Sequence, residues 1–160
     1  DISNKISKRT SNLWTPSTGG IYPLLKKLEK DGLVIGKWDD PKKKFQKIYY
    51  LTDLGEKEFQ HRRDYIAQKI SDIPLLSSLL PKGAFYILID ISKLLGTEVK
   101  GCMLNNSYDV AKVLLDYYQV AVVPSDAFGV ENYIRISFAT AMRDVVEGGN
   151  RIEKFVKENF

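Results

Sequence analysis

One arginine stands in a setting that suits recognition of a carboxylate. Arg135 lies in the run 133–139, where residues alternate as they do in a half-buried β-strand. A guanidinium group presents a planar fork of N–H donors that pairs bidentately with a carboxylate. The same side chain could instead form an ordinary ion pair, and on the pattern alone this second interpretation is favoured. The acidic residues that could supply such a pair are Asp90, Asp126 and Glu131.

A second group of residues suits binding to a polyanion. Pro41 and the three lysines after it separate two runs typical of strands, 33–39 and 45–51, and predict the tip of a hairpin. Before the hairpin, apolar residues recur at helical spacing between Ser17, a good N-cap, and Gly32, a common helix end. Such a helix can enter the major groove of DNA while the lysines neutralise phosphates. The candidate DNA-binding residues are Ser17, Thr18, Tyr22, Lys26, Lys27, Lys42, Lys43 and Lys44.

Two interpretations of this basic group stay open. In the first, Ser17, Thr18 and Tyr22 position the helix or read bases, and the lysines supply affinity more than sequence choice. In the second, the apolar stripe is core and the lysines are only solvated. Residues 1–64 hold 14 Lys and Arg against 9 Asp and Glu, whereas residues 65–160 hold 10 against 11. This asymmetry is typical of a nucleic-acid module joined to a neutral one.

The single cysteine and the single histidine exclude several chemistries. Cys102 alone permits no internal disulfide, so a reducing, cytoplasmic setting is the default expectation. His61 stands beside Arg62 and Arg63 and is expected on an exposed helix face, not as a catalytic base or metal ligand. No apolar run reaches a membrane-spanning length, so no membrane partner is expected.

The elements that must position Arg135 alternate between strands and helices, which indicates an α/β layer. A helix capped by Ser107 lies between two of the strands. A further helix should begin at Asp53, with Glu56 at capping-box spacing, and span residues 53–71 at the junction with the preceding hairpin. The expected elements of the layer are strands over 84–91, 120–124 and 133–139 and helices over 107–117 and 143–159.

The first part of the chain resembles a known family. The run Leu13–Val34, LWTPSTGGIYPLLKKLEKDGLV, and the run Ile48–Gly55, IYYLTDLG, are similar to the PadR family of winged-helix transcriptional regulators. The resemblance implies that residues 1–56 bind double-stranded DNA and that the helix after the wing leads into the contacts of a homodimer. The chain begins where the second helix of that family begins, so the first helix is expected to be missing.

The second part resembles the small domain of class I aminotransferases of the aspartate aminotransferase group. Six ordered segments carry the likeness: Phe59–Asp64, Pro81–Tyr86, Asp90–Ser92, Val120–Pro124, Ala127–Gly129 and Tyr133–Ala139. The resemblance implies that residues 57–160 form this domain and that Arg135 pairs with the α-carboxylate of a substrate. It also implies that pyridoxal phosphate (PLP) belongs to the parent family, with its lysine, aspartate and phosphate cup in a large domain. We therefore expect this chain alone to bind no cofactor and to catalyse no transamination.

Together these patterns predict an α+β mosaic, in which a partial winged helix of helices and a β-hairpin wing precedes the α/β aminotransferase small-domain-like layer. The predicted function is that of a fusion of a DNA-binding regulator segment with a catalytically incomplete small domain. Two alternatives stay open: the C-terminal portion of a PLP-dependent aspartate aminotransferase-like enzyme, and an inactive chimera with only a structural role. The expected partners are double-stranded DNA, a carboxylate ligand and a second copy of the chain, with no metal.

Overall fold

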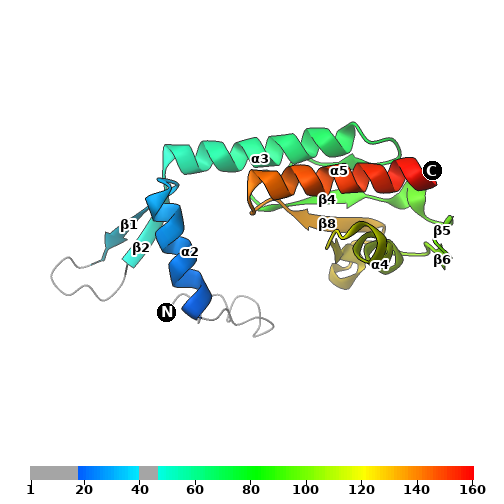
Figure 1. The fold of residues 1–160 in the computed structure, drawn as a ribbon, viewed down its shortest axis with the longest axis horizontal. Helices are drawn as coiled ribbons and strands as arrows, with labels where there is room; N and C mark the ends of the chain where they lie inside the picture. The colour runs from blue at the N-terminus through cyan, green and yellow to red at the C-terminus, as the bar shows by residue number, and fades with distance from the viewer. Residues whose placement is uncertain (1–17, 40–46) are drawn as a thin grey trace. The chain divides into compact units, whose positions relative to one another are not determined.

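The computed structural model describes residues 18–39 and 47–160. These residues fall into two compact units, residues 1–58 and residues 59–160, and each unit is described by itself. None of the helices among the described residues is both long enough and apolar enough to cross a membrane. Figure 1 follows the chain through its elements.

The first unit contains a helix and an antiparallel pair of strands. Helix α2 (Thr18–Lys30) is followed by Gly32, which adopts a φ of 71° that favours glycine. Strands β1 (Val34–Trp38) and β2 (Lys47–Leu51) pair in antiparallel register, with Val34 opposite Leu51. The predicted helix end and both predicted strands are therefore present. The predicted hairpin tip at Pro41–Lys44 lies outside the described residues, and the winged-helix assignment as a whole stays a prediction.

A partly buried ion pair joins the strand pair to α2. The Glu29 carboxylate accepts hydrogen bonds from the Lys47 ammonium, at 2.7 and 2.9 Å, and from the Gly36 amide, at 3.1 Å. The Lys47 hydrogen bond holds the pKa of Glu29 below its usual value. A Cβ atom at Gly36 would meet the end of the Lys47 side chain, so a larger residue here would have to displace the lysine that binds Glu29.

Helix α3 (Asp53–Ser71) has the predicted bounds but a different cap. Thr52, not Asp53, satisfies the first turn: its hydroxyl accepts from the Gly55 amide at 3.0 Å and donates to the Gly32 carbonyl at 2.6 Å. The same hydroxyl thus fixes the start of α3 and the end of the turn after α2. The cap expected at Asp53 is wrong, because Asp53 is already the first residue of the helix and the preceding Thr52 binds the Gly55 amide.

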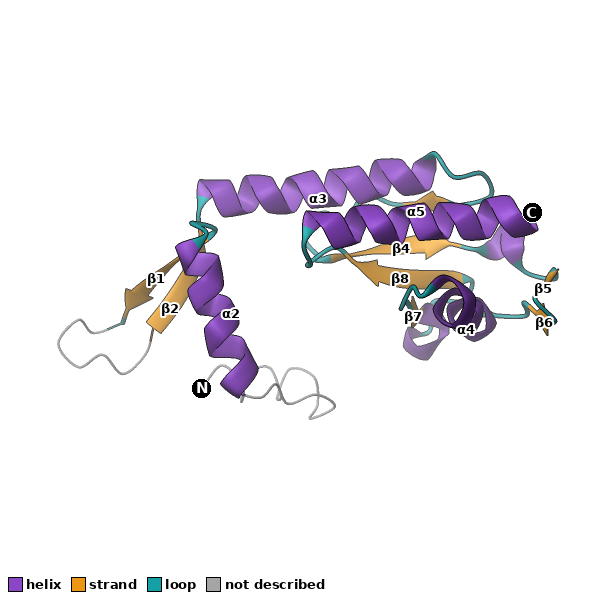
Figure 2. Ribbon diagram, in the orientation of Figure 1, coloured by secondary structure: helices purple, strands orange, loops and turns teal. Residues whose placement is uncertain are grey.

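The second unit is built on a four-stranded sheet. The central strands β4 (Tyr86–Asp90) and β8 (Tyr133–Ser137) pair along five residues each, and two-residue strands flank them. The order is β3 (Ser77–Ser78), β4, β8, β7 (Val123–Pro124), with every neighbouring pair antiparallel. A separate short hairpin joins β5 (Glu98–Val99) to β6 (Cys102–Met103). Figure 2 shows β4, β8 and β7 of this sheet below α5.

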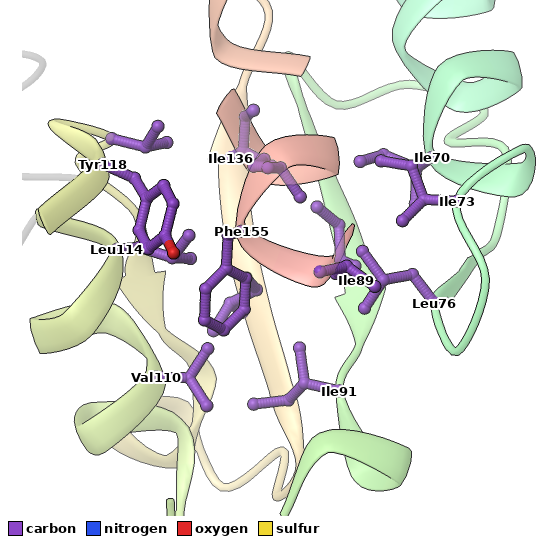
Figure 3. Packing of buried hydrophobic residues seen from close by; sticks show 14 of the residues in the cluster. Ile70, Ile73, Leu76, Ile89, Ile91, Val110, Leu114, Tyr118, Ile136 and Phe155 are labelled. Carbon is purple, nitrogen blue, oxygen red and sulfur yellow. The ribbon is translucent and has the colours of Figure 1, made fainter. Parts of the chain in front are cut away.

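Three helices cover one face of this sheet. The later turns of α3, helix α4 (Ser107–Tyr118) and helix α5 (Met142–Asn159) send buried side chains onto Ile87 and Ile89 of β4 and Ile134 and Ile136 of β8. Figure 3 shows α5 between α4 and α3, with Phe155 in the middle of the cluster. Phe155 is 1% exposed and its ring lies 5.3 Å from that of Tyr118. The apolar core of the unit is therefore the space between one helix layer and one sheet face.

This arrangement corrects the predicted α/β layer. An antiparallel sheet with all its helices on one face is an α+β layer. Strands β4 and β7 do run parallel to each other, since both are antiparallel to β8, and α4 connects them. The expected strand–helix–strand crossover is thus present, but β8 is inserted between its two strands.

Charged side chains also link the helix layer. Lys69 of α3 and Lys157 of α5 both contact the Glu153 carboxylate, at 2.6 and 2.7 Å. The hydrogen bonds from Lys157 and Lys69 lower the pKa of Glu153 to about 2. Gly149 lies beside this contact, where a Cβ atom would meet Lys69 Cγ at 2.9 Å. The glycine therefore allows α3 and α5 to approach closely.

Candidate functional site

Arg135 lies on the face of the sheet that the helices leave open. It stands in β8 between the buried residues Ile134 and Ile136, so strand alternation directs it away from the core. Its direct neighbours across the sheet are Leu88 of β4 and Val123 of β7. The predicted strand around Arg135 is present in the structure.

The guanidinium group of Arg135 is held between two aromatic rings. Its central carbon lies 4.7 Å from the ring centroid of Tyr86 on β4 and 4.5 Å from that of Phe128. Both distances are those of cation–π contacts. Across the described part of the chain, Arg135 forms no ion pair.

The ion pair that the sequence pattern favoured is therefore wrong. The Asp90 carboxylate accepts a hydrogen bond from the Ser92 amide, and the Asp126 carboxylate accepts from the amide and hydroxyl of Ser107. Local N–H and O–H groups thus bind two of the three carboxylates that could have paired with Arg135. Glu131 is exposed and makes no ion pair with Arg135.

A short 3₁₀ helix, η2 (Ser125–Phe128), positions Phe128. Asp126 lies within it, and the Ser107 hydroxyl bond lowers the pKa of this carboxyl group. Gly129 ends the turn with a φ of 73°, and its amide donates to the Asp126 carbonyl at 3.0 Å. The segment that carries Phe128 is therefore fixed at Asp126 by the first turn of α4 and closed at Gly129 by a left-handed residue.

The start of α4 also corrects a sequence prediction. Asn106, not Ser107, is the N-cap: its side-chain oxygen accepts from the amides of Tyr108 and Asp109 at 2.9 and 3.2 Å. Ser107 is fully buried, and its amide donates to Asp126 at 3.0 Å. The predicted cap residue thus joins the helix to the turn that holds Phe128.

The arrangement around Arg135 can bind a planar anion but does not fit PLP. Both rings lie close to the central carbon of the guanidinium group, whose N–H donors all point outward in its own plane, so a partner approaches these donors along the edge of the group. PLP needs a lysine for its imine and a carboxylate for its ring nitrogen. The described strand residues that share the face of Arg135 include no lysine: they are Ser77, Tyr86, Leu88, Asp90, Val123, Tyr133 and Ser137.

The candidate DNA-binding residues are only partly described. Tyr22 is 49% exposed on α2, and Lys26 and Lys27 are exposed on the same helix. Thr18 begins α2, while Ser17 and Lys42–Lys44 lie outside the described residues. The structure adds Lys37, an exposed residue of β1 whose ammonium group lies 5.9 Å from the ring of Tyr50. Sequence reasoning missed Lys37, although its place in an alternating strand is a usable signal.

The remaining titratable candidates form no site in the described part of the chain. His61 is exposed on α3, as predicted. Cys102 is partly exposed and is not in a disulfide. No group of three or more histidine, cysteine, aspartate or glutamate side chains among the described residues could hold a metal ion.

Comparisons with known proteins match the two parts of the chain to two families. Residues 1–61 match the transcriptional regulator PadR-like family, and residues 43–148 match aminotransferase class I and II. The second match covers about two thirds of the chain. The two matched ranges overlap over residues 43–61, which include the start of α3.

Individual relatives and solved structures are aminotransferases. A bifunctional aspartate aminotransferase and glutamate/aspartate-prephenate aminotransferase of Petunia hybrida is 42% identical over 99 residues, which are 61% of this chain and 21% of that protein. An aspartate aminotransferase of Streptomyces avermitilis is 37% identical over 110 residues, or 68% of this chain and 27% of that protein. The crystal structure of the aspartate aminotransferase from Rhizobium meliloti superposes with a TM-score of 0.62 and 32% identity, over 67% of this chain and 28% of that one. The chain thus spans about a quarter of the length of these relatives.

Proposed function

The chain belongs to the aminotransferase class I and II family, and on this premise we propose that its second unit is a carboxylate-recognition module built on Arg135. The observation that carries the proposal is an arginine on an open sheet face that forms no ion pair with any described residue and lies at cation–π distance from the rings of Tyr86 and Phe128. An arginine held in this way keeps its N–H edges for a ligand. The module binds a carboxylate and, by itself, does not transaminate.

The family match and the local chemistry both support this division of roles. The family is one of PLP enzymes, yet the residues around Arg135 do not fit that cofactor. A guanidinium group alone supplies charge and two parallel hydrogen bonds, which are enough to bind and orient a carboxylate. It supplies no electron sink for the carbanion that transamination creates. Residues 57–160 therefore act as a small-domain-like binding part, with no catalytic residue of their own.

Replacing Arg135 tests the binding proposal. We expect the full chain to bind 2-oxoglutarate saturably when the binding is followed by isothermal titration calorimetry, which reads every variant in the same way. Arg135→Leu should abolish saturable binding, because it removes both the charge and the donor fork. Arg135→Lys should weaken binding about tenfold, because an ammonium group keeps the charge but cannot form the planar bidentate pair.

The controls for this test separate charge from site. Arg143→Leu removes one positive charge from an arginine whose side chain is 88% exposed and pairs with Asp144, so binding should be unchanged. Far-ultraviolet circular dichroism should be the same for all variants, since Arg135 lies outside the core. Equal affinity of Arg135→Leu and the unaltered chain for 2-oxoglutarate would refute the proposed site.

A second function, DNA binding by residues 1–56, is favoured by the PadR-like match over residues 1–61. The exposed Lys26 and Lys27 on α2 and the basic excess of this part of the chain support it. In this proposal α2 lies in the major groove of double-stranded DNA, and Lys42–Lys44 contact the phosphates. The chain is then a fusion of a regulator segment with a carboxylate-binding module.

Salt dependence tests the proposed role of the lysines. With a double-stranded DNA probe, changing Lys42, Lys43 and Lys44 to alanine should reduce the slope of log affinity against log salt by about three, one for each lost phosphate contact. Changing three exposed lysines of the second unit, Lys82, Lys93 and Lys154, should leave the slope unchanged. A slope that responds equally to both triple variants would mean that binding is only a general charge effect.

A further inference from the structure

We infer that Phe128 is a positioning residue for Arg135 and that the contact between Ser107 and Asp126 holds Phe128 in place. The inference rests on the proposed carboxylate site and deepens it, because it states what keeps the guanidinium group ready for the ligand. Three links join the helix layer to the site. Ser107 forms hydrogen bonds with Asp126, Asp126 and Phe128 both lie in η2, and Phe128 contacts Arg135.

Phe128 is too exposed to serve mainly as a core residue. Its side chain is 59% exposed, so burial in the core does not account for an aromatic residue at this position. Its ring instead lies 4.5 Å from the guanidinium carbon of Arg135. A ring in this position interacts with the positive charge through its face and limits the rotation of a long, flexible side chain.

The two rings that hold Arg135 differ in how they are fixed. Tyr86 is part of the central strand β4, where Ser137 of β8 is its partner in the sheet register. Phe128 lies at the end of a four-residue turn, and no strand pairing fixes it. The position of the Phe128 ring therefore depends on how η2 is anchored.

Helix α4 provides that anchor. The Ser107 amide and hydroxyl both donate to Asp126 Oδ2, and the Asp126 amide lies 3.4 Å from the Ser107 hydroxyl. Ser107 is fully buried in the first turn of α4, so its position is set by the core. Phe128 follows Asp126 by two residues in η2. The buried Ser107, by holding Asp126, therefore helps to fix the position of the Phe128 ring beside Arg135.

This geometry also limits how a ligand can bind. The N–H donors of Arg135 lie in the plane of the guanidinium group, and the rings of Tyr86 and Phe128 lie beside its central carbon. A carboxylate is itself planar and can pair with two of these donors in that plane. The positioning role of Phe128 is thus to keep the fork in the orientation that accepts a carboxylate edge to edge.

The test compares three variants of the full chain in the same 2-oxoglutarate titration. Phe128→Leu keeps an apolar side chain but removes the ring, and should weaken binding about three- to tenfold. Phe128→Tyr restores a ring and should bind as the unaltered chain does. Ser107→Ala removes one of the two donors to Asp126 and should fall between these two. Phe160→Leu is the matched control, because Phe160 is 42% exposed and its ring pairs with Phe155 instead.

A second readout in the free protein detects positioning directly. Side-chain protons of Arg135 between two rings should have ring-current shifts, which Phe128→Leu should reduce and Phe128→Tyr should keep. If Phe128→Leu binds 2-oxoglutarate as tightly as the unaltered chain while Arg135→Leu does not bind, the positioning role is wrong and the carboxylate site stands. If Arg135→Leu binds as tightly as the unaltered chain, the proposed site and the positioning role both fall.

Discussion

Phe155→Ala is expected to destabilise the second unit by about 3–5 kcal/mol, the usual cost of removing a buried phenylalanine ring from a core. Phe155 is 1% exposed on α5, and its ring packs edge-on against Tyr118 at 5.3 Å and Phe160 at 5.8 Å. Three helices and the sheet meet around it, so no single element can move in to fill the space. A unit of this size has a total stability of roughly 5–15 kcal/mol, so the variant should lie near the limit of folding.

The two tryptophans make this prediction easy to measure. Trp14 and Trp38 both lie before residue 59, so tryptophan fluorescence reports on the first unit, whereas circular dichroism reports on all the helices. In urea, Phe155→Ala should lower the midpoint seen by circular dichroism. Phe85→Ala is the control: Phe85 is 58% exposed, and its loss should cost less than about 1 kcal/mol. If the two variants lost stability equally, Phe155 would not be the centre of the core.

Gly55→Ala is expected to destabilise the first unit even though alanine is the better helix former. Within a helix, glycine to alanine normally gains about 0.5–1 kcal/mol. At Gly55 in α3, however, the new Cβ atom would lie 2.0 Å from the carbonyl oxygen of Leu33, a backbone atom that cannot rotate away. Overpacking of this kind costs about 1–3 kcal/mol, so the clash should outweigh the gain in helix propensity.

For Gly148, also inside a helix, the change to alanine is expected to raise stability. Gly148 lies inside α5, and a Cβ atom there would meet nothing within 4 Å. Gly148→Ala should therefore stabilise the second unit by about 0.5–1 kcal/mol. Urea denaturation followed by tryptophan fluorescence for Gly55→Ala and by circular dichroism for Gly148→Ala checks both signs. A rise in the midpoint for Gly55→Ala would show that α3 can move away from Leu33.

The sequence predicted the elements of the second unit better than their caps. An apolar run identified β4 and alternation identified β8, while the bounds predicted for α4 and α5 agree with the structure to within one residue. The caps predicted for α3 and α4 were each wrong by one residue, because Thr52 precedes Asp53 and Asn106 precedes Ser107, and all four residue types are favourable N-caps. In the second case the choice depends on Asp126, which binds Ser107 from 19 residues away.

The site was predicted in the same partial way. Strand alternation was enough to place Arg135 in a half-buried strand, and the structure shows that it lies on the face away from the core. Its two rings were not identified as site residues, because Tyr86 is on a different strand and Phe128 is in a turn too short to show periodicity. The ion pair favoured by the pattern is not formed, because nearby amides and a hydroxyl donate hydrogen bonds to the carboxylates of Asp90 and Asp126. Such local competition for a carboxylate cannot be read from spacing.

The sheet of the second unit has outermost strands of only two residues each. An exposed strand edge with free N–H and C=O groups is a template on which other chains can add and aggregate. Here β3 offers a very short edge, and β7 ends at Pro124, which has no amide hydrogen to donate. The unit therefore resists open-ended stacking of copies through its β-sheet, although it leaves one broad sheet face free for a ligand.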